Sequence, residues 1–188
     1  MKNAGKIFEE DFKKSIPEYC LLIRIPDPPQ AFEQNSNTKF SRKNVCDYYC
    51  FHSKSRIFYA LELKSTKNKY ITYEDVMLDE PPNKMIHKHQ ILGLLNYTKY
   101  DNIVAGFVFN FRDEQKDMER TYFQNIKDFL LMSKQINKFS FNEIDLLMYG
   151  GIKIAGDKKR THYRWNLDKF FMWDHINNLN VEHTEKGE

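Results

Sequence analysis

The chain has 188 residues, of which 41% are hydrophobic and 15% aromatic, so it is long enough to bury a core without covalent or metal cross-links. Its formal net charge of +3 is too small to indicate a nucleic-acid partner by itself. No apolar run reaches the roughly 18 residues that a membrane span needs. We therefore expect one domain over residues 1–175, a flexible tail at 176–188 and no membrane partner.

The ends of the chain and its cysteines bear on where the protein works. The first residues, MKNAGKIFEEDF, are charged and lack the apolar stretch of a secretory signal, which favours a cytoplasmic location. Three cysteines, Cys20, Cys46 and Cys50, leave one thiol unpaired in any disulfide scheme, and no second Cys/His pair completes a zinc site. We interpret them as buried, reduced thiols.

The first elements expected along the chain are a helix, three strands and a long loop. Apolar residues repeat at helical spacing over 3–15, and a strand follows at 19–25. Residues 26–44 are rich in Pro, Asn and Ser, which predicts a loop of the kind that contacts a substrate. Strands at 45–51 and 56–64 then flank the turn sequence HSKSR as a hairpin.

The second half alternates in the same way. We expect a helix at 84–99, a buried strand at 102–111, a shorter strand at 119–123 and a helix at 124–136. A tail of mixed character completes the chain, with neither an internal repeat nor a low-complexity segment. The resulting order of elements is αβββαβ, followed by further short elements.

The predicted hairpin carries three charged residues among its aromatics. Side chains alternate between faces along a strand, so Glu62 and Lys64 project together. Asp47 shares their face if the numbers of opposed residues add up to an odd value, as they do when a four-residue loop pairs 51 with 56. In that register Asp47 lies diagonal to Glu62, roughly 7 to 8 Å away between Cα atoms, within reach of one shared cation.

Two carboxylates at this spacing predict a particular chemistry. Together with a backbone carbonyl such as that of Leu63 and water, Asp47 and Glu62 would form an all-oxygen site suited to Mg²⁺ or Mn²⁺. Lys64 beside that metal could hold the attacking water, while the metal would stabilise charge on a phosphoryl oxygen. The implied reaction is phosphodiester hydrolysis. The alternative is that charged residues near strand ends simply face water.

Basic residues cluster around these acids. Between residues 38 and 70 there are eight lysines and arginines, with Asp47 and Glu62 the acids among them, and a second basic cluster covers 153–164. Such patches suit a polyanion, although a solvated face is the alternative. Arg24 could equally form a salt bridge. The candidate DNA contacts are Arg24, Lys39, Arg42, Lys43, Lys67 and Lys69.

Several sequence blocks occur together in a recognisable order. They are GKIFEEDFKKS, NVCDYY, ALELKSTKN, KMIHKHQ, GFVFNF and EIDLLMYGGIKI, and they cover most of residues 5–171. In this arrangement the chain resembles the PD-(D/E)XK nuclease superfamily and, within it, the RecU-type Holliday-junction resolvases. The resemblance implies an α/β, restriction-endonuclease-like fold with a mixed central β-sheet flanked by helices.

The resemblance also implies roles for individual residues. Asp47, Glu62 and Lys64 would be the catalytic triad, Gln90 the glutamine of the following helix, and Glu9 the acid of the first helix, reaching the metal directly or through water. The cofactor would be Mg²⁺, with Mn²⁺ as a substitute. The partners would be branched DNA with four arms, a second copy of the chain in a homodimer, and recombination proteins.

Two departures from the family pattern bear on specificity. Cys46 stands where these proteins usually have threonine, so a hydroxyl contact near the metal is absent. The segment 26–44 corresponds to the basic stalk that enters the junction in the family, but it is shorter and has Lys39, Arg42 and Lys43 as its cations. Junction selectivity is therefore less strongly implied than nuclease chemistry.

The helix that carries Gln90 adds two expectations. Gln90 lies on the same helix face as Ile86 and Leu94, so it should be partly buried and need a partner, for which the predicted site is a candidate. His87 and His89 are two residues apart, which places them on different faces of a helix and argues against a histidine metal site. We assign them no role.

Three functions are consistent with these residues. The first is a metal-dependent, structure-selective endonuclease that resolves four-way junctions in recombination or repair as a homodimer, since symmetric cutting needs two sites related by a twofold axis. The second is a PD-(D/E)XK nuclease for another DNA substrate, such as a flap, a nicked duplex or a sequence-specific duplex. The third is a catalytically silent DNA-binding or recombinase-modulating protein.

Overall fold

The protein is built on a mixed six-stranded sheet, seen in a computed structural model that describes residues 4–26, 43–78 and 83–172. Strands β3 and β5 run parallel, and the other neighbouring pairs are antiparallel. In spatial order the strands are β1 (Cys20–Arg24), β2 (Tyr48–His52), β3 (Ile57–Thr66), β5 (Ile103–Asp113), β6 (Met118–Asn125) and β8 (Ile152–Ile154).

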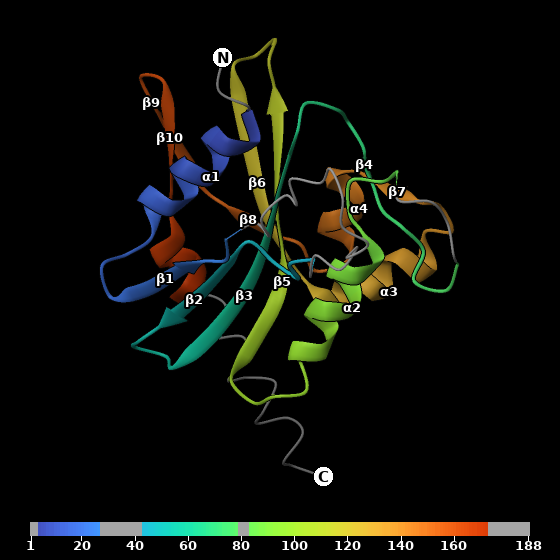
Figure 1. The fold of residues 1–188 in the computed structure, drawn as a ribbon. Coiled ribbons are helices and arrows are strands. Elements are labelled where there is room, and N and C mark those ends of the chain that lie inside the picture. Colours follow the sequence, from blue (N-terminus) through green and yellow to red (C-terminus); the bar gives the residue numbers. More distant parts are fainter. Residues whose placement is uncertain (1–3, 27–42, 79–82, 173–188) are drawn as a thin grey trace, which may run out of the picture.

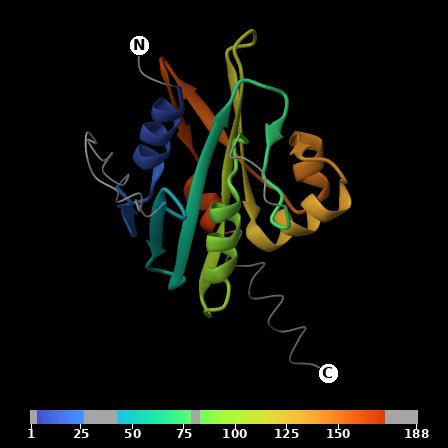
Figure 2. The same cartoon turned by 45° about the vertical axis from the view of Figure 1, so that its right-hand side comes forward.

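Further elements cover the two faces of this sheet (Figure 1). On one face lie α2 (Lys88–Tyr97), α3 (Ile126–Gln135) and α4 (Glu143–Met148), with a small sheet of β4 (Ile71–Thr72) and β7 (Ser140–Phe141). On the other face lie α1 (Ala4–Ser15), the hairpin of β9 (Gly156–Lys159) and β10 (His162–Trp165), and a helical segment that starts at Leu167. The turned view in Figure 2 shows the sheet nearly edge-on between these layers.

Each face of the sheet has its own hydrophobic core, because side chains alternate along the strands. On the α1 face, Tyr59 and Leu61 of β3 pack in a cluster with Phe171, and all three are fully buried. On the α2 face, Ala60 belongs to a second cluster with Phe107 of β5. The central strand β3 is therefore buried on both sides.

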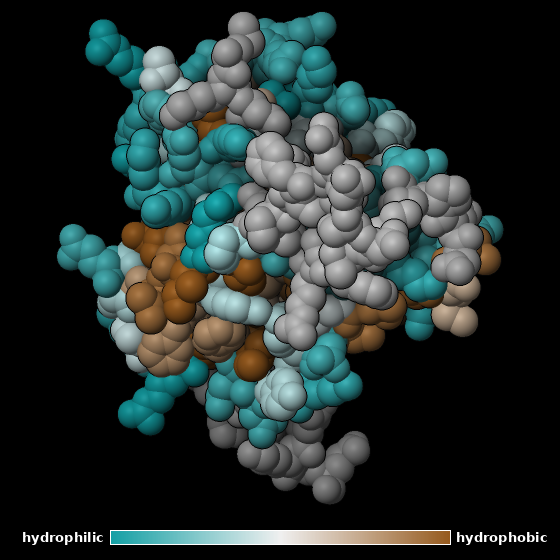
Figure 3. Space-filling model, in the orientation of Figure 1, coloured by the Kyte–Doolittle hydropathy of each residue, from teal (hydrophilic) through white to brown (hydrophobic). Residues whose placement is uncertain are grey.

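The α2 face is less fully covered over the first two strands. Leu21 and Ile23 of β1 are 59% and 49% exposed, and Phe51 of β2 is 37% exposed. Figure 3 shows apolar side chains gathered at the lower left of the molecule, in the region of these strands. Helix α2 thus packs over β3 and β5 and leaves part of β1 and β2 accessible.

The predicted elements recur with adjusted ends. The helix expected at 84–99 begins only at Lys88, because Ile86 instead forms a bridge with Tyr73, and the amide of Glu74 donates to the Ile86 carbonyl at 2.9 Å. Cys20, Cys46 and Cys50 are free and buried, as expected. Most of the loop at 26–44 and the tail at 176–188 lie outside the described residues. In the described part of the chain, no helix has the length and apolar character to cross a membrane.

Candidate active site

The β2–β3 hairpin sets the relative position of the predicted carboxylates. Its four-residue turn lies between His52 and Ile57, so Phe51 pairs with Phe58 and the predicted pairing of 51 with 56 is wrong. The shift is two residues, which leaves the sum of paired numbers odd and keeps Asp47 on the predicted face. Extended by one position, this register sets Asp47 opposite Glu62, where a diagonal placement was predicted.

Asp47 is tied to the strand that carries Glu62. Its Oδ2 accepts a hydrogen bond from the backbone amide of Leu63 at 2.7 Å, and its own amide donates to the carbonyl of Leu61 at 3.1 Å. Because both contacts run to residues beside Glu62, the two carboxylates cannot drift apart without breaking the end of the ladder. The predicted ligand role of the Leu63 carbonyl stays a prediction.

Glu62 and Lys64 form a close ion pair on the α2 face. The Lys64 Nζ lies 2.8 Å from Glu62 Oε1, and the two side chains are 17% and 5% exposed. Alternation along β3 directs both residues away from the aromatic core of the opposite face. When Glu62 is ionised, the lysine compensates part of its charge.

Gln90 reaches the same carboxylate from α2. Its Nε2 donates to Glu62 Oε1, while its own Oε1 accepts the backbone amide of His87 at 3.0 Å. The helix can come this close because Gly93 faces Val45, where a Cβ would lie 2.5 Å from a valine methyl. The expectation that Gln90 is at least partly buried is confirmed, since it is 7% exposed, and Glu62 is the partner of its amino group.

Burial makes Glu62 an unusual acid. Loss of hydration raises its pKa from 4.5 to about 8; the Lys64 ammonium acts in the opposite direction, and the charge of Asp47 raises the pKa further. A cation between the two carboxylates would relieve the repulsion that Asp47 adds. The donors are oxygen atoms, which suits a hard divalent ion such as Mg²⁺. The two side chains therefore fit the metal that the sequence predicts.

Cys46 lies beside this pair without joining it. Its side chain is fully buried, and its Sγ points to the carbonyl of Tyr48 at 3.7 Å. Burial, with contributions from Glu62 and Asp47, raises the pKa of its thiol to about 12. A thiol that keeps its proton at neutral pH is a poor metal ligand, so Cys46 fills space where a hydroxyl was expected in the family pattern.

Glu9 and Arg24 meet each other on the neighbouring edge of the molecule. Glu9 Oε2 lies 3.7 Å from Arg24 Nη2, so the salt bridge considered for Arg24 is present. Within the described ranges no three His, Cys, Asp or Glu side chains form a group that could hold a metal ion. Glu9 is therefore not a third member of a direct cluster with Asp47 and Glu62, and its role through water stays a prediction.

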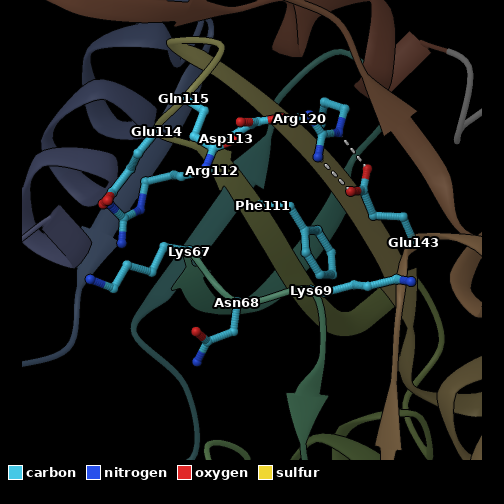
Figure 4. Close-up of a pocket in the computed structure, with 10 residues that line it drawn as sticks. All are labelled: Lys67, Asn68, Lys69, Phe111, Arg112, Asp113, Glu114, Gln115, Arg120 and Glu143. Carbon is cyan, nitrogen blue, oxygen red and sulfur yellow. Dashed lines mark hydrogen bonds and ion pairs between the residues drawn. The ribbon is translucent and has the colours of Figure 1, made fainter.

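The predicted basic contacts fall in different places. Lys67 and Lys69 line a cavity of about 360 Å³ beyond the end of β3, shown in Figure 4 with Arg112 and Arg120. Arg120 is paired with Glu143 through two 2.7 Å hydrogen bonds, so its guanidinium is less available to a DNA phosphate than the two lysine ammonium groups. Lys43 is exposed next to the hairpin. Lys39 and Arg42 lie outside the described residues.

Near Gln90, one buried acid and one histidine depart from what the sequence predicted. Glu74, 8% exposed, accepts hydrogen bonds from His87 Nδ1 at 2.8 Å and from the Lys88 amide at 2.7 Å. His87 stands at the N-cap of α2, and its ring stacks on that of His89 with centroids 5.6 Å apart, so the prediction of different faces is wrong. Gln90 stands three residues after the N-cap residue His87, as the glutamine of a capping box does, although histidine is not a usual N-cap residue. No sequence pattern pointed to Glu74.

The fold and the site together define a mixed α/β protein with a paired-carboxylate site next to a lysine and a glutamine. The chain is 31% identical over 179 residues to the SPbeta prophage-derived uncharacterized protein YotM of Bacillus subtilis (strain 168), a match that covers 89% of this chain and 84% of that protein. The chain therefore belongs to the same family as YotM. No protein-family model matches the chain.

Proposed function

We propose that the protein is a Mg²⁺-dependent DNA endonuclease of the PD-(D/E)XK superfamily that resolves four-way junctions. The observation that carries this proposal is the convergence of Asp47, Glu62, Lys64 and Gln90 on one side of β3, with Lys64 and Gln90 both directed at the Glu62 carboxylate. The mixed sheet and its helical layers support the restriction-endonuclease-like fold that belongs to this proposal.

The carboxylates would hold the metal ion. Asp47 and Glu62 would bind Mg²⁺, with Mn²⁺ as a substitute, and the Leu63 carbonyl and water would complete the set. When bound, the ion supplies a positive charge that stabilises a phosphoryl oxygen and lowers the pKa of water. Gln90 fixes the orientation of Glu62, because a carboxylate held by a buried amide cannot rotate away from its partner.

Lys64 would act on the reacting groups. Its ammonium is held beside Glu62 on the strand that presents the carboxylate, so it can donate a hydrogen bond to a water or phosphate oxygen placed there. Such a donor acts mainly where charge develops in the transition state, and it therefore raises the rate of the chemical step more than it tightens DNA binding.

The substrate would follow the basic side chains away from this point. Lys67 and Lys69 lie three and five residues after Lys64, at the rim of the cavity in Figure 4. Contacts between lysines and phosphates carry affinity and salt dependence, whereas junction selectivity needs a group at the branch point. That task would fall to the 26–44 segment with Lys39, Arg42 and Lys43.

We further propose an assembly and a cellular location for the active protein. Symmetric cleavage of two strands requires two sites related by a twofold axis, so the active species would be a homodimer. It would act on branched DNA in the cytoplasm, together with recombination proteins.

A labelled four-way junction and a linear duplex of the same arm sequence test the proposal. We expect cleavage of the junction in Mg²⁺ or Mn²⁺, and binding without turnover in Ca²⁺, whose longer and looser coordination positions water poorly. Equal cleavage of both DNAs would move the assignment to a nuclease with another substrate. Binding without cleavage in any divalent ion would favour a catalytically silent DNA-binding protein.

The basic segment can be tested separately from the chemistry. Replacing Lys39, Arg42 and Lys43 with alanine should weaken junction binding and reduce its salt dependence by up to about three phosphate contacts. The preference for junction over duplex should fall as well, measured by competition binding at several salt concentrations. A preference that does not change would show that the segment does not read the branch point.

A further inference from the structure

A second buried carboxylate, that of Glu74, lies at the start of the helix that carries Gln90. Glu74 follows β4 and is 8% exposed, and it uses both of its oxygens at the start of α2. Its Oε1 lies 2.8 Å from His87 Nδ1, and its Oε2 accepts the Lys88 amide at 2.7 Å. One carboxylate thus holds the side chain of the N-cap residue and the first amide of the helix.

Further hydrogen bonds connect these contacts to Glu62. The backbone amide of His87, whose ring Glu74 holds, donates to Gln90 Oε1 at 3.0 Å. This bond determines the orientation of the Gln90 side-chain amide, because its oxygen must face a hydrogen-bond donor. The amino group of Gln90 is thereby left to donate to Glu62 Oε1.

The backbone around Glu74 is also fixed. The amide of Glu74 donates to the carbonyl of Ile86 at 2.9 Å, and the amide of Ile86 donates to the carbonyl of Thr72 at 3.0 Å. The end of β4 and the start of α2 therefore move as one unit. Any change at Glu74 is expected to be felt at Gln90 through two hydrogen bonds in series.

We propose that Glu74 and His87 are positioning residues that aim the side-chain amide of Gln90 at Glu62. The orientation itself depends only on these contacts, whereas its consequence for metal binding rests on the proposed function. In this scheme Glu74 touches neither metal nor DNA. It sets the direction of α2. It also sets the tautomer of His87, whose Nδ1–H donates a hydrogen bond to the carboxylate.

The molecule contains a matched pair on the opposite face of the sheet. Asp11 of α1, 3% exposed, lies 2.8 Å from His162 Nδ1 and accepts the backbone amide of Tyr163 at 2.8 Å. The chemistry is the same, a buried carboxylate shared by a histidine ring and a neighbouring amide. This pair joins α1 to β10, away from the α2 layer, so it shows what a purely structural role would give.

The side-chain amide of Gln90 in a ¹⁵N spectrum provides a readout that does not depend on activity. Its resonances are assigned by their loss in Gln90→Asn. In Glu74→Gln and His87→Leu we expect hydrogen exchange of this amide to rise by about tenfold or more, since the local opening that exposes it becomes easier. His87→Asn, whose side-chain amino group can replace Nδ1–H, should restore slow exchange. Asp11→Asn and His162→Leu should leave it unchanged.

Mn²⁺ binding by calorimetry, with thermal unfolding as a check on folding, completes the test. Glu74→Gln should weaken Mn²⁺ binding by about tenfold, the lower end of the effect of groups that support metal ligands, and Asp11→Asn should not. Unchanged Gln90 exchange in Glu74→Gln, or an equal change in Asp11→Asn, would overturn the inference. A wild-type protein that neither binds Mn²⁺ nor cleaves DNA would overturn the proposed function, while amide exchange would still decide the positioning role.

Discussion

The two faces of β3 are built from neighbouring residues for opposite purposes. Leu61 and Leu63 point into the aromatic core under α1, where Leu61 is fully buried. Glu62 and Lys64 point to the α2 side, where a carboxylate only 5% exposed depends on one ammonium and one amide. The first face stabilises the folded state by removing apolar surface from water. The second face destabilises it, because a charged group loses its hydration.

The residues that stabilise the fold and those proposed to act in catalysis therefore lie on different faces of one strand. A buried carboxylate whose pKa is raised to about 8 is a poor way to stabilise a fold, and its burial fits the catalytic role that we propose for it. If the comparison is right, substitutions on the two faces of one strand should have different consequences. Activity should depend on one face and folding on the other.

The largest expected effect comes from the carboxylates. Asp47→Asn and Glu62→Gln should each lower junction cleavage by at least about 10²–10³-fold, since each removes a charge that the metal requires. Junction binding, measured by gel shift in Ca²⁺, should stay largely intact because it depends on phosphate-facing cations.

Matched controls for these variants are available on the surface. Asp101→Asn and Glu18→Gln change exposed acids outside the α2 site and should cleave like the wild type. Near wild-type cleavage by either site variant would contradict the metal assignment.

The opposite face should respond in stability. Leu61→Ala removes a fully buried side chain and should lower the free energy of unfolding by about 2–5 kcal/mol, measured by urea titration. The cleavage rate per folded molecule should not change. Leu21→Ala, at a position 59% exposed, serves as the control and should change stability by less than about 0.5 kcal/mol. A Leu61→Ala protein of wild-type stability would contradict the role of this face in folding.

Lys64 should matter for rate more than for binding. Lys64→Ala should slow single-turnover cleavage by about 10²-fold, because the ammonium acts where charge develops in the transition state. DNA affinity should fall only by the contribution of one weak contact between the ammonium group and a phosphate. If affinity falls as much as the rate, Lys64 is a DNA-binding residue and not a group that acts on the reacting atoms.

A further expectation concerns the pH dependence of stability. With a pKa of about 8 in the folded protein and 4.5 as the ordinary value, Glu62 holds a proton that the unfolded chain has lost. Its contribution to stability is complete below about pH 4.5 and is lost as pH rises to about 8, so the metal-free protein should lose unfolding free energy across this window. Glu62→Gln should remove this component of the slope in urea titrations at several pH values.

The same proton links pH to metal binding. Because Mg²⁺ needs the ionised carboxylate, its affinity should rise by up to about tenfold per pH unit below pH 8 and level off above it. Calorimetry in two buffers of different ionisation enthalpy should show about one proton released at pH 7. An affinity independent of pH between 6 and 8 would indicate that Glu62 is already charged in the folded protein.

Local sequence patterns were enough to predict several features of this protein. Alternation along β3 determined that Glu62 and Lys64 share a face, and the helical repeat through Gln90 and Leu94 determined which side of α2 is buried. The succession of the main helices and strands also follows from local apolar patterns. These properties depend on residues close together in the chain, so the sequence by itself specifies them.

Other features of the site depend on contacts between separate elements. The two-residue shift of the β2–β3 register depends on where the turn closes, and Asp47 therefore stands opposite Glu62 instead of diagonal to it. The direction of the Gln90 amide depends on the amide of His87, and the position of His87 depends on Glu74, which is thirteen residues away along the chain. Hydrogen bonds between separate elements have no periodic signature in a sequence, because their partners are brought together only when β4, α2 and β3 pack.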